Sequence, residues 1–262
     1  METRLYMILS SLIIAFSMYS RIPMPKVDWS EKNMRFSLCF FPFVGAVAGA
    51  ACMLWVRASG CFDVGSTAKV CILTAIPLMV TGGIHADGFV DTMDAVHSWQ
   101  DQKKKLEILK DSHIGAFAVI MLILYYLCMV AAISEIDFEK EGTMLTFVMM
   151  FVYSRALSGT ALVFGKSAKR EGLAYTFARA GDLKTVRIIM ILWDAACVAA
   201  VCYADLKLGT VFLAAGALLV THFLRHTKKE FGGLTGDLCG CFIMMAELLF
   251  AVIICTFCHL GH

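Results

Sequence analysis

Three aspartates in one short segment are the clearest candidates for metal-binding side chains in this sequence. Asp87, Asp91 and Asp94 are spaced i, i+4 and i+7 within residues 82–95, GGIHADGFVDTMDA. On a helix they would fall within about 60° of one face, where three like charges repel one another. A hard cation such as Mg²⁺ would offset that repulsion, and it prefers oxygen ligands. The spacing therefore predicts a metal site, with a solvated acidic face as the alternative.

His85, just before these aspartates, is a candidate general base, although a structural role is the alternative. A second polar cluster, KDSH at 110–113, precedes an apolar run. Asp111 and Ser112 are good N-cap residues, and capping alone would explain them. In the functional interpretation, Lys110, Ser112 and the helix start bind phosphate, while Asp111 contributes to catalysis or to the metal site.

A glycine-rich segment, FGGLTGDL at 231–238, is the third polar cluster. Its glycines would let backbone N–H groups approach an anion closely. The expected phosphate-binding residues are Gly232, Gly233, Thr235 and Gly236. Asp237 could add a carboxylate to the metal, and the alternative is a flexible loop with Asp237 as a helix N-cap. Together, the carboxylates, the divalent metal and the glycine-rich loop favour phosphoryl or nucleotidyl transfer.

The elements that carry these clusters follow from a strongly apolar composition. Of the 262 residues, 59% are hydrophobic and only 17% are charged, and the mean hydropathy is +0.74. A soluble domain carries about 25% charge, and disorder requires low hydrophobicity, so the composition excludes both. The net charge of +2 is too small to indicate a nucleic-acid partner. The composition therefore predicts a polytopic membrane protein.

Apolar runs of about 20 residues predict the membrane helices. Seven stretches fit or nearly fit, at about 36–57, 68–84, 114–134, 143–164, 188–204, 208–224 and 238–260. An eighth, at about 5–20, is shorter and does not have the pattern of a cleaved signal peptide. It could span, lie in the interface or re-enter. We expect one all-α domain over residues 1–262, a helical bundle with about seven spans.

Basic residues alternate between the connections and predict the orientation. Seventeen of the 23 lysines and arginines fall in the connections 21–35, 85–113, 165–187 and 225–237. These connections are predicted to face the cytoplasm, and all three polar clusters lie on their side. We expect a multi-pass protein of a bacterial or archaeal cytoplasmic membrane, in contact with lipid and with its active site facing the cytoplasm. A homo-oligomeric state is left open.

Few ionisable residues fall inside the predicted spans, chiefly Arg155, Asp194 and Glu247. Arg155 needs a carboxylate partner, which Asp194 or Glu247 could provide, and we favour a structural pair or a lining role. Gly45 and Gly49 have the spacing of close helix packing.

The 11 cysteines lie mostly in apolar runs, which indicates small apolar side chains rather than a disulfide framework. Residues 255–259, CTFCH, match the spacing of haem attachment. The end of an apolar helix is the favoured interpretation.

Several of these motifs resemble the cobalamin synthase family, the adenosylcobinamide-GDP ribazoletransferases. The similar segments are SRIPMP (20–25), FPFVG (41–45), GGIHADGFVDTMDA (82–95), KDSHIGAFA (110–118), EGL (171–173) and GGLTGDLCG (232–240). The resemblance implies a Mg²⁺-dependent membrane enzyme that joins adenosylcobinamide-GDP to α-ribazole, or to its 5′-phosphate, and releases GMP. This would be the last assembly step of cobalamin biosynthesis.

The resemblance also implies roles for individual residues. The metal ligands would be Asp87, Asp91, Asp94 and Asp237, and the candidate catalytic residues are His85, Asp91 and Asp111. Two alternatives stay open. A lipid-type CDP-alcohol phosphotransferase has a similar D-G-x-x-x-D spacing. A cation-coupled transporter would instead place ionisable groups near the bilayer midplane, and here the carboxylates lie at the cytoplasmic edge.

Overall fold

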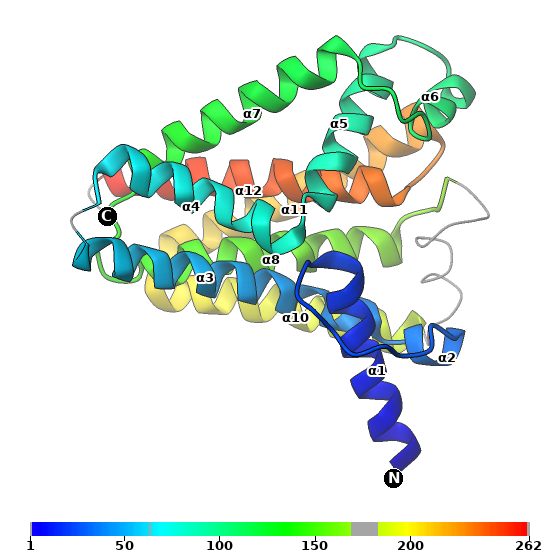
Figure 1. Ribbon diagram of the computed structural model, residues 1–262, viewed down its shortest axis with the longest axis horizontal. Coiled ribbons are helices and arrows are strands. Elements are labelled where there is room, and N and C mark those ends of the chain that lie inside the picture. The colour runs from blue at the N-terminus through cyan, green and yellow to red at the C-terminus, as the bar shows by residue number, and fades with distance from the viewer. Residues whose placement is uncertain (1, 63, 169–182, 261–262) are drawn as a thin grey trace.

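The protein is a bundle of long helices (Figure 1). The computed structural model describes residues 2–62, 64–168 and 183–260. The helices are α1 (Glu2–Tyr19), α2 (Glu31–Met34), the 3-10 helix η1 (Ser37–Phe40), α3 (Phe41–Cys61), α4 (Ser66–Thr81), α5 (Ile84–His97), α6 (Gln102–Ile108), α7 (Ala116–Ser134), α8 (Thr143–Phe164), α10 (Leu183–Ala204), α11 (Leu206–Phe231) and α12 (Gly236–His259). Much of the predicted loop 165–187, including the segment 171–173, lies outside the described residues. The predicted all-α class is confirmed.

Six helical segments are long and apolar enough to cross a membrane: Glu31–Cys61, α7, α8, α10, α11 and α12. The predicted span 68–84 is different. α4 has 16 residues, about 24 Å at 1.5 Å per residue, whereas the hydrocarbon core is about 30 Å thick. It ends at Gly82, and α5 leaves at an angle of 94°. The predicted seventh span is therefore not one continuous helix, because two glycines interrupt it before α5.

The N-terminal helix α1 does not run along the bundle. In Figure 1 it lies across the direction of the long helices, with its N-terminal end pointing away from them. Its apolar part, Leu5–Tyr19, is shorter than a span. Ile14 and Met18 are buried, whereas Leu5 and Leu9 are exposed. Only the C-terminal half of α1 therefore packs against the rest of the chain.

α8 forms the centre of the bundle, and most of its side chains are buried. α3 approaches it closely because Gly45 and Gly49 have no side chain at the crossing. A Cβ on Gly49 would lie 2.8 Å from the Cγ1 atom of Val148, and one on Gly45 would collide with the backbone of Phe151. The predicted close packing at these two glycines is confirmed.

A buried ion pair joins α8 to α12. Arg155 donates from Nη1 to the Glu247 carboxylate, and both side chains are almost fully buried. Asp194, the other predicted partner, instead accepts a hydrogen bond from the Thr160 hydroxyl at 2.6 Å. The structural-pair interpretation is therefore confirmed for Glu247. The haem interpretation of 255–259 gains no support, because His259 at the end of α12 contacts Glu135 at 3.2 Å.

The connections divide between the two ends of the bundle as the basic residues predicted. In Figure 1 the α5–α6–α7 and α11–α12 connections lie at one end, and the α3–α4, α7–α8 and α10–α11 connections lie at the other. The three polar clusters of the sequence all belong to the first end, which we call the basic end.

Removing the carboxylate of Glu247 would leave the Arg155 charge buried without its partner. We expect Glu247→Ala to lower the unfolding free energy by about 3–5 kcal/mol, measured as a lower Tm of the purified protein in detergent. The double variant Arg155→Met, Glu247→Leu should recover most of the loss, since it buries no charge. An unchanged Tm for Glu247→Ala would contradict this role.

Candidate active site

The bend between α4 and α5 sets the start of the site. Gly82 and Gly83 have φ angles of +65° and +83°, a conformation that side chains disfavour. Gly82 also packs directly against the side chain of Arg21. The backbone N–H of Arg21 donates to the carbonyl oxygen of Val80 at 2.9 Å. The double glycine therefore ends α4 and turns the chain so that the aspartates follow on α5.

α5 crosses the first turns of α12 at a pair of glycines. A Cβ on Gly88 would lie 2.6 Å from the carbonyl oxygen of Asp237, and one on Gly240 would lie 3.3 Å from the Cα atom of His85. No larger residue fits at Gly88 without separating the helices. The crossing places Asp87, which precedes Gly88, beside the start of α12.

Asp87 and Asp237 line one cleft. His85 lines it as well, and its Nε2 atom is buried with no hydrogen-bond partner in the described structure. The remaining walls are mainly apolar and come from α1, η1, α3, α8 and α12. The cleft thus joins residues of the first and third sequence clusters, as predicted.

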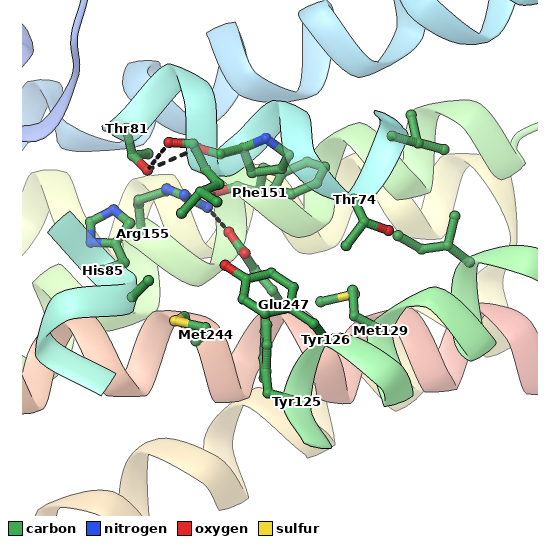
Figure 2. A pocket seen from close by; sticks show the side chains of 15 residues that line it. Thr74, Thr81, His85, Tyr125, Tyr126, Met129, Phe151, Arg155, Met244 and Glu247 are labelled. Atoms are coloured by element: carbon green, nitrogen blue, oxygen red, sulfur yellow. Dashed lines mark hydrogen bonds and ion pairs between the residues drawn. The ribbon is translucent and has the colours of Figure 1, made fainter. Parts of the chain in front are cut away.

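His85 also lines a second cavity, which reaches the Arg155–Glu247 pair. Figure 2 shows His85 beside Arg155, with Tyr125 and Tyr126 on the opposite side of the ion pair. His85 therefore separates the carboxylate cleft from the buried ion pair.

The charges of the other three carboxylates affect the pKa of Asp91. α5 is not one of the six long spans. The pKa of Asp91 on this helix is raised to about 6 by burial and, to a smaller extent, by the charges of Asp87, Asp237 and Asp94. No three His, Cys, Asp or Glu side chains converge into a ready-made metal cage in the part of the chain that the structure describes. A Mg²⁺ ion here would need further ligands from water and substrate phosphates, which is how proteins commonly hold it.

Asp94 has a structural task. Its Oδ2 atom accepts a hydrogen bond from the N–H of Gly115 at 2.5 Å, and its Oδ1 atom accepts one from the N–H of Ala118 at 3.2 Å. Asp94 therefore caps the start of α7 from another helix. The capping interpretation of Asp111 and Ser112 is wrong, because α7 begins at Ala116 and its N-cap residue is Gly115, which has no side chain to accept a hydrogen bond.

The second polar cluster lies outside the cleft. Lys110, Asp111, Ser112 and His113 are all exposed. The Asp111 Oδ1 atom lies 2.6 Å from the His113 Nδ1 atom, and this hydrogen bond lowers the pKa of Asp111 and raises that of His113. The catalytic role of Asp111 and the substrate-binding roles of Lys110 and Ser112 stay predictions.

The glycine-rich segment divides into two parts. Gly232 ends α11 in the left-handed conformation, and the Gly233 N–H donates to the carbonyl oxygen of Thr227 at 3.2 Å. Thr235 caps α12 by accepting from the Leu238 N–H at 3.3 Å, so the N-cap interpretation of Asp237 is wrong. Gly236 has open space around it and lines the cleft.

These contacts separate the predicted phosphate-binding residues. Gly236 adjoins the cleft at a helix start, where an anion is stabilised by the helix dipole. Gly232, Gly233 and Thr235 each have a part in ending or starting a helix. Their phosphate-binding role stays a prediction.

Some cleft residues carried no predicted chemistry, notably Tyr19, Phe41 and Ser158. For Tyr19 and Phe41, the sequence offered one signal, their position beside or within a motif segment. Tyr19 directly precedes the segment 20–25, and Phe41 begins the segment 41–45.

The cap at Asp94 distinguishes this residue from its neighbours. We expect Asp94→Ala to lower the unfolding free energy by about 1 kcal/mol, the usual cost of losing a helix cap, and Asp94→Asn to lose less. Asp87→Ala is the matched control, since it removes a carboxylate from the same face without removing a cap. Thermal unfolding in detergent gives the comparison, and equal Tm values for the two alanine variants would contradict the capping role.

The chain is similar to known proteins along most of its length. The model of the family described as cobalamin-5-phosphate synthase matches residues 11–255. A relative named adenosylcobinamide-GDP ribazoletransferase from Lachnoclostridium phytofermentans is 39% identical over 92% of this chain and 91% of its own length. Relatives with the same name from Geobacillus sp. (strain WCH70) and Clostridium botulinum (strain Alaska E43 / Type E3) are 32% and 29% identical, over 91% and 94% of this chain and 92% and 97% of their own lengths.

No solved structure matches the chain. The family match nevertheless runs almost from end to end and includes every residue that lines the cleft. The chain belongs to the cobalamin-5-phosphate synthase family.

Proposed function

We propose that the protein is an adenosylcobinamide-GDP ribazoletransferase, which joins adenosylcobinamide-GDP to α-ribazole or to its 5′-phosphate. The products are adenosylcobalamin or its 5′-phosphate, and GMP. One observation carries the proposal at the level of the site: Asp87, Asp237 and His85 share one cleft with the start of α12. The name of the relatives supports this activity over the CDP-alcohol phosphotransferase and transporter alternatives.

The proposed reaction replaces a phosphoanhydride bond by a phosphoester bond. The ribazole hydroxyl oxygen attacks the phosphorus next to the cobinamide arm, and the pyrophosphate bond to GMP breaks with its electron pair leaving on GMP. The hydroxyl proton has to be accepted within the cleft. We assign this role to His85, because its buried Nε2 atom has no other hydrogen-bond partner among the described residues.

We propose Mg²⁺ as the cofactor, held by Asp87, Asp237 and Asp91. The donor set fits, since it consists of carboxylates, and the charges of Asp87 and Asp237 add to burial in raising the pKa of Asp91. Asp94 is a weaker candidate because α7 occupies both of its oxygens. When bound, the metal neutralises charge that develops on the phosphate groups.

The start of α12 adds a positive partial charge at the cleft, suited to an anionic phosphate. We also propose that the basic end of the bundle faces the cytoplasm, where positively charged connections accumulate. The nucleotide and the ribazole would then enter from the cytoplasm. Contact with membrane lipid follows from the apolar outer faces of helices such as α7, which exposes Ile120 and Leu127.

Reconstitution tests the activity. Purified protein in detergent, supplied with adenosylcobinamide-GDP, α-ribazole and Mg²⁺, should form GMP and a cobalamin product, measured by chromatography. Asp87→Asn and Asp237→Asn should each lower kcat by about 100-fold or more, as loss of a group that binds the reacting phosphate does. Asp137→Asn, an exposed carboxylate at the opposite end, is the control. Failure of the wild type to form product would reject the proposed function.

Mg²⁺ binding should also depend on pH. The pKa of Asp91 is raised to about 6 in the folded protein, against about 3.9 unfolded. The folded state therefore binds more protons between these values, and the stability that protonated Asp91 contributes is lost as the pH rises through 6. We expect millimolar Mg²⁺ to raise the Tm more at pH 7.5 than at pH 5. A shift of equal size at both pH values, or in Asp91→Asn, would argue against the site.

A further inference from the structure

Arg21 lies against the glycine turn that leads into the aspartates of α5. Its backbone N–H donates to the carbonyl oxygen of Val80, in the last turn of α4, at 2.9 Å. Its side chain covers Gly82 so closely that a Cβ on this glycine would lie 2.5 Å from the Arg21 Nε atom and 2.8 Å from its Cδ atom. Figure 1 shows the connection after α1 next to the junction of α4 and α5. Both the backbone and the side chain of Arg21 therefore contact the turn that positions the site.

The guanidinium group of Arg21 has no counter-charge of its own. Among the described residues, no carboxylate oxygen lies within 4.0 Å of its nitrogens. The other arginine near the site, Arg155, is buried and paired with Glu247, whereas the Arg21 residue is exposed. The charge of Arg21 is therefore open to a ligand that approaches from outside the bundle.

The neighbours of Arg21 line the site, both along the chain and in space. Tyr19, two residues earlier, lines the carboxylate cleft, and Gly82 lines a groove together with Asp87. Asp87 follows Gly83 by one helical turn, about 5.4 Å, and its N–H donates to the Gly83 carbonyl oxygen at 2.9 Å. Arg21 and Asp87 thus lie at neighbouring turns of the chain, without the ion pair that direct contact would produce.

A diphosphate needs a cation that the site otherwise does not provide from its own side chains. Among the described residues that line the cleft or the groove, none is a lysine or an arginine. Asp87 and Asp237 are carboxylates, which repel phosphate oxygens. An arginine presents a planar fork of N–H donors that binds two phosphate oxygens at once. The unpaired guanidinium of Arg21 therefore complements an anionic substrate at a site whose other charged side chains are acidic.

We propose that Arg21 binds the diphosphate group of adenosylcobinamide-GDP. This inference rests on the proposed function and adds a substrate-binding residue to it. When the pyrophosphate bond breaks, its electron pair leaves on GMP, so negative charge grows on a phosphate oxygen. A guanidinium group held beside the diphosphate stabilises that charge as it develops. Arg21 accordingly contributes to binding of the nucleotide substrate and to the rate of its cleavage.

Removing the charge of Arg21 should weaken one substrate selectively. Arg21→Met keeps an unbranched side chain against Gly82 and loses the guanidinium group. We expect it to raise the Kd of GDP, measured by isothermal titration calorimetry in detergent with Mg²⁺, by about tenfold or more, the loss expected for a charge-assisted hydrogen bond. The kcat/KM for adenosylcobinamide-GDP should fall by about 100-fold or more. The KM for α-ribazole, which has no diphosphate, should stay within about twofold.

The matched control is Arg225→Met, which removes the same charge from an exposed arginine of α11 at the basic end. It should leave the Kd of GDP and both KM values within about twofold. Arg21→Lys keeps the charge but not the planar fork, so its Kd for GDP should lie between those of the wild type and Arg21→Met.

Equal Kd values for GDP in the wild type and folded Arg21→Met, or no binding of GDP by the wild type, would overturn the proposal. Circular dichroism and Tm in detergent verify folding. If Arg21→Met does not fold, Arg21→Lys decides in its place, and an unchanged Kd for GDP would overturn the proposal. A wild type that binds GDP through Arg21 but forms no cobalamin product would reject the proposed reaction while supporting this binding role.

Discussion

The structure of the site depends on a contact between two helix backbones. α5 can lie against the start of α12 only because Gly88 and Gly240 present no side chain at the crossing. The contact brings Asp87 and Asp237 to one cleft, although their charges and that of Asp91 oppose it. Packing of the helices in the bundle offsets this repulsion, and burial, followed by the charges of Asp87, Asp237 and Asp94, raises the pKa of Asp91.

This crossing also explains why the motif residues have mixed tasks. In the segment 82–95, two glycines turn the chain, a third allows the crossing, Asp94 caps α7, and Asp87 faces the cleft. In the segment 232–240, Gly232 ends a helix and Thr235 starts the next. A short motif can therefore be strongly constrained while only one or two of its side chains touch the reacting groups.

The sequence predicted the fold more completely than the site. Hydropathy located the long helices, with the largest error at the end of α11, which was predicted at 224 and lies at Phe231. The alternation of basic residues matched the two ends of the bundle. Hydropathy averages over a window, so it did not detect the 94° bend that two glycines with positive φ introduce. Nor could local patterns show that α7 is capped by Asp94, since the partner lies 21 residues away in the chain. Local sequence could not identify the apolar wall at Tyr19 and Phe41 either. These residues resemble the other apolar residues of membrane helices, and only the tertiary structure brings them together.

The cleft draws its lining from Met18 through Ile243 and from helices throughout the bundle. Among the described residues, no segment shorter than Met18–Ile243 contains the whole lining, so the cleft could not be excised as a smaller unit or made water-soluble by removing the spans. Recombination that exchanged one half of the chain would separate Asp87 from Asp237, so variation in this protein is expected to accumulate by single substitutions rather than by exchange of modules.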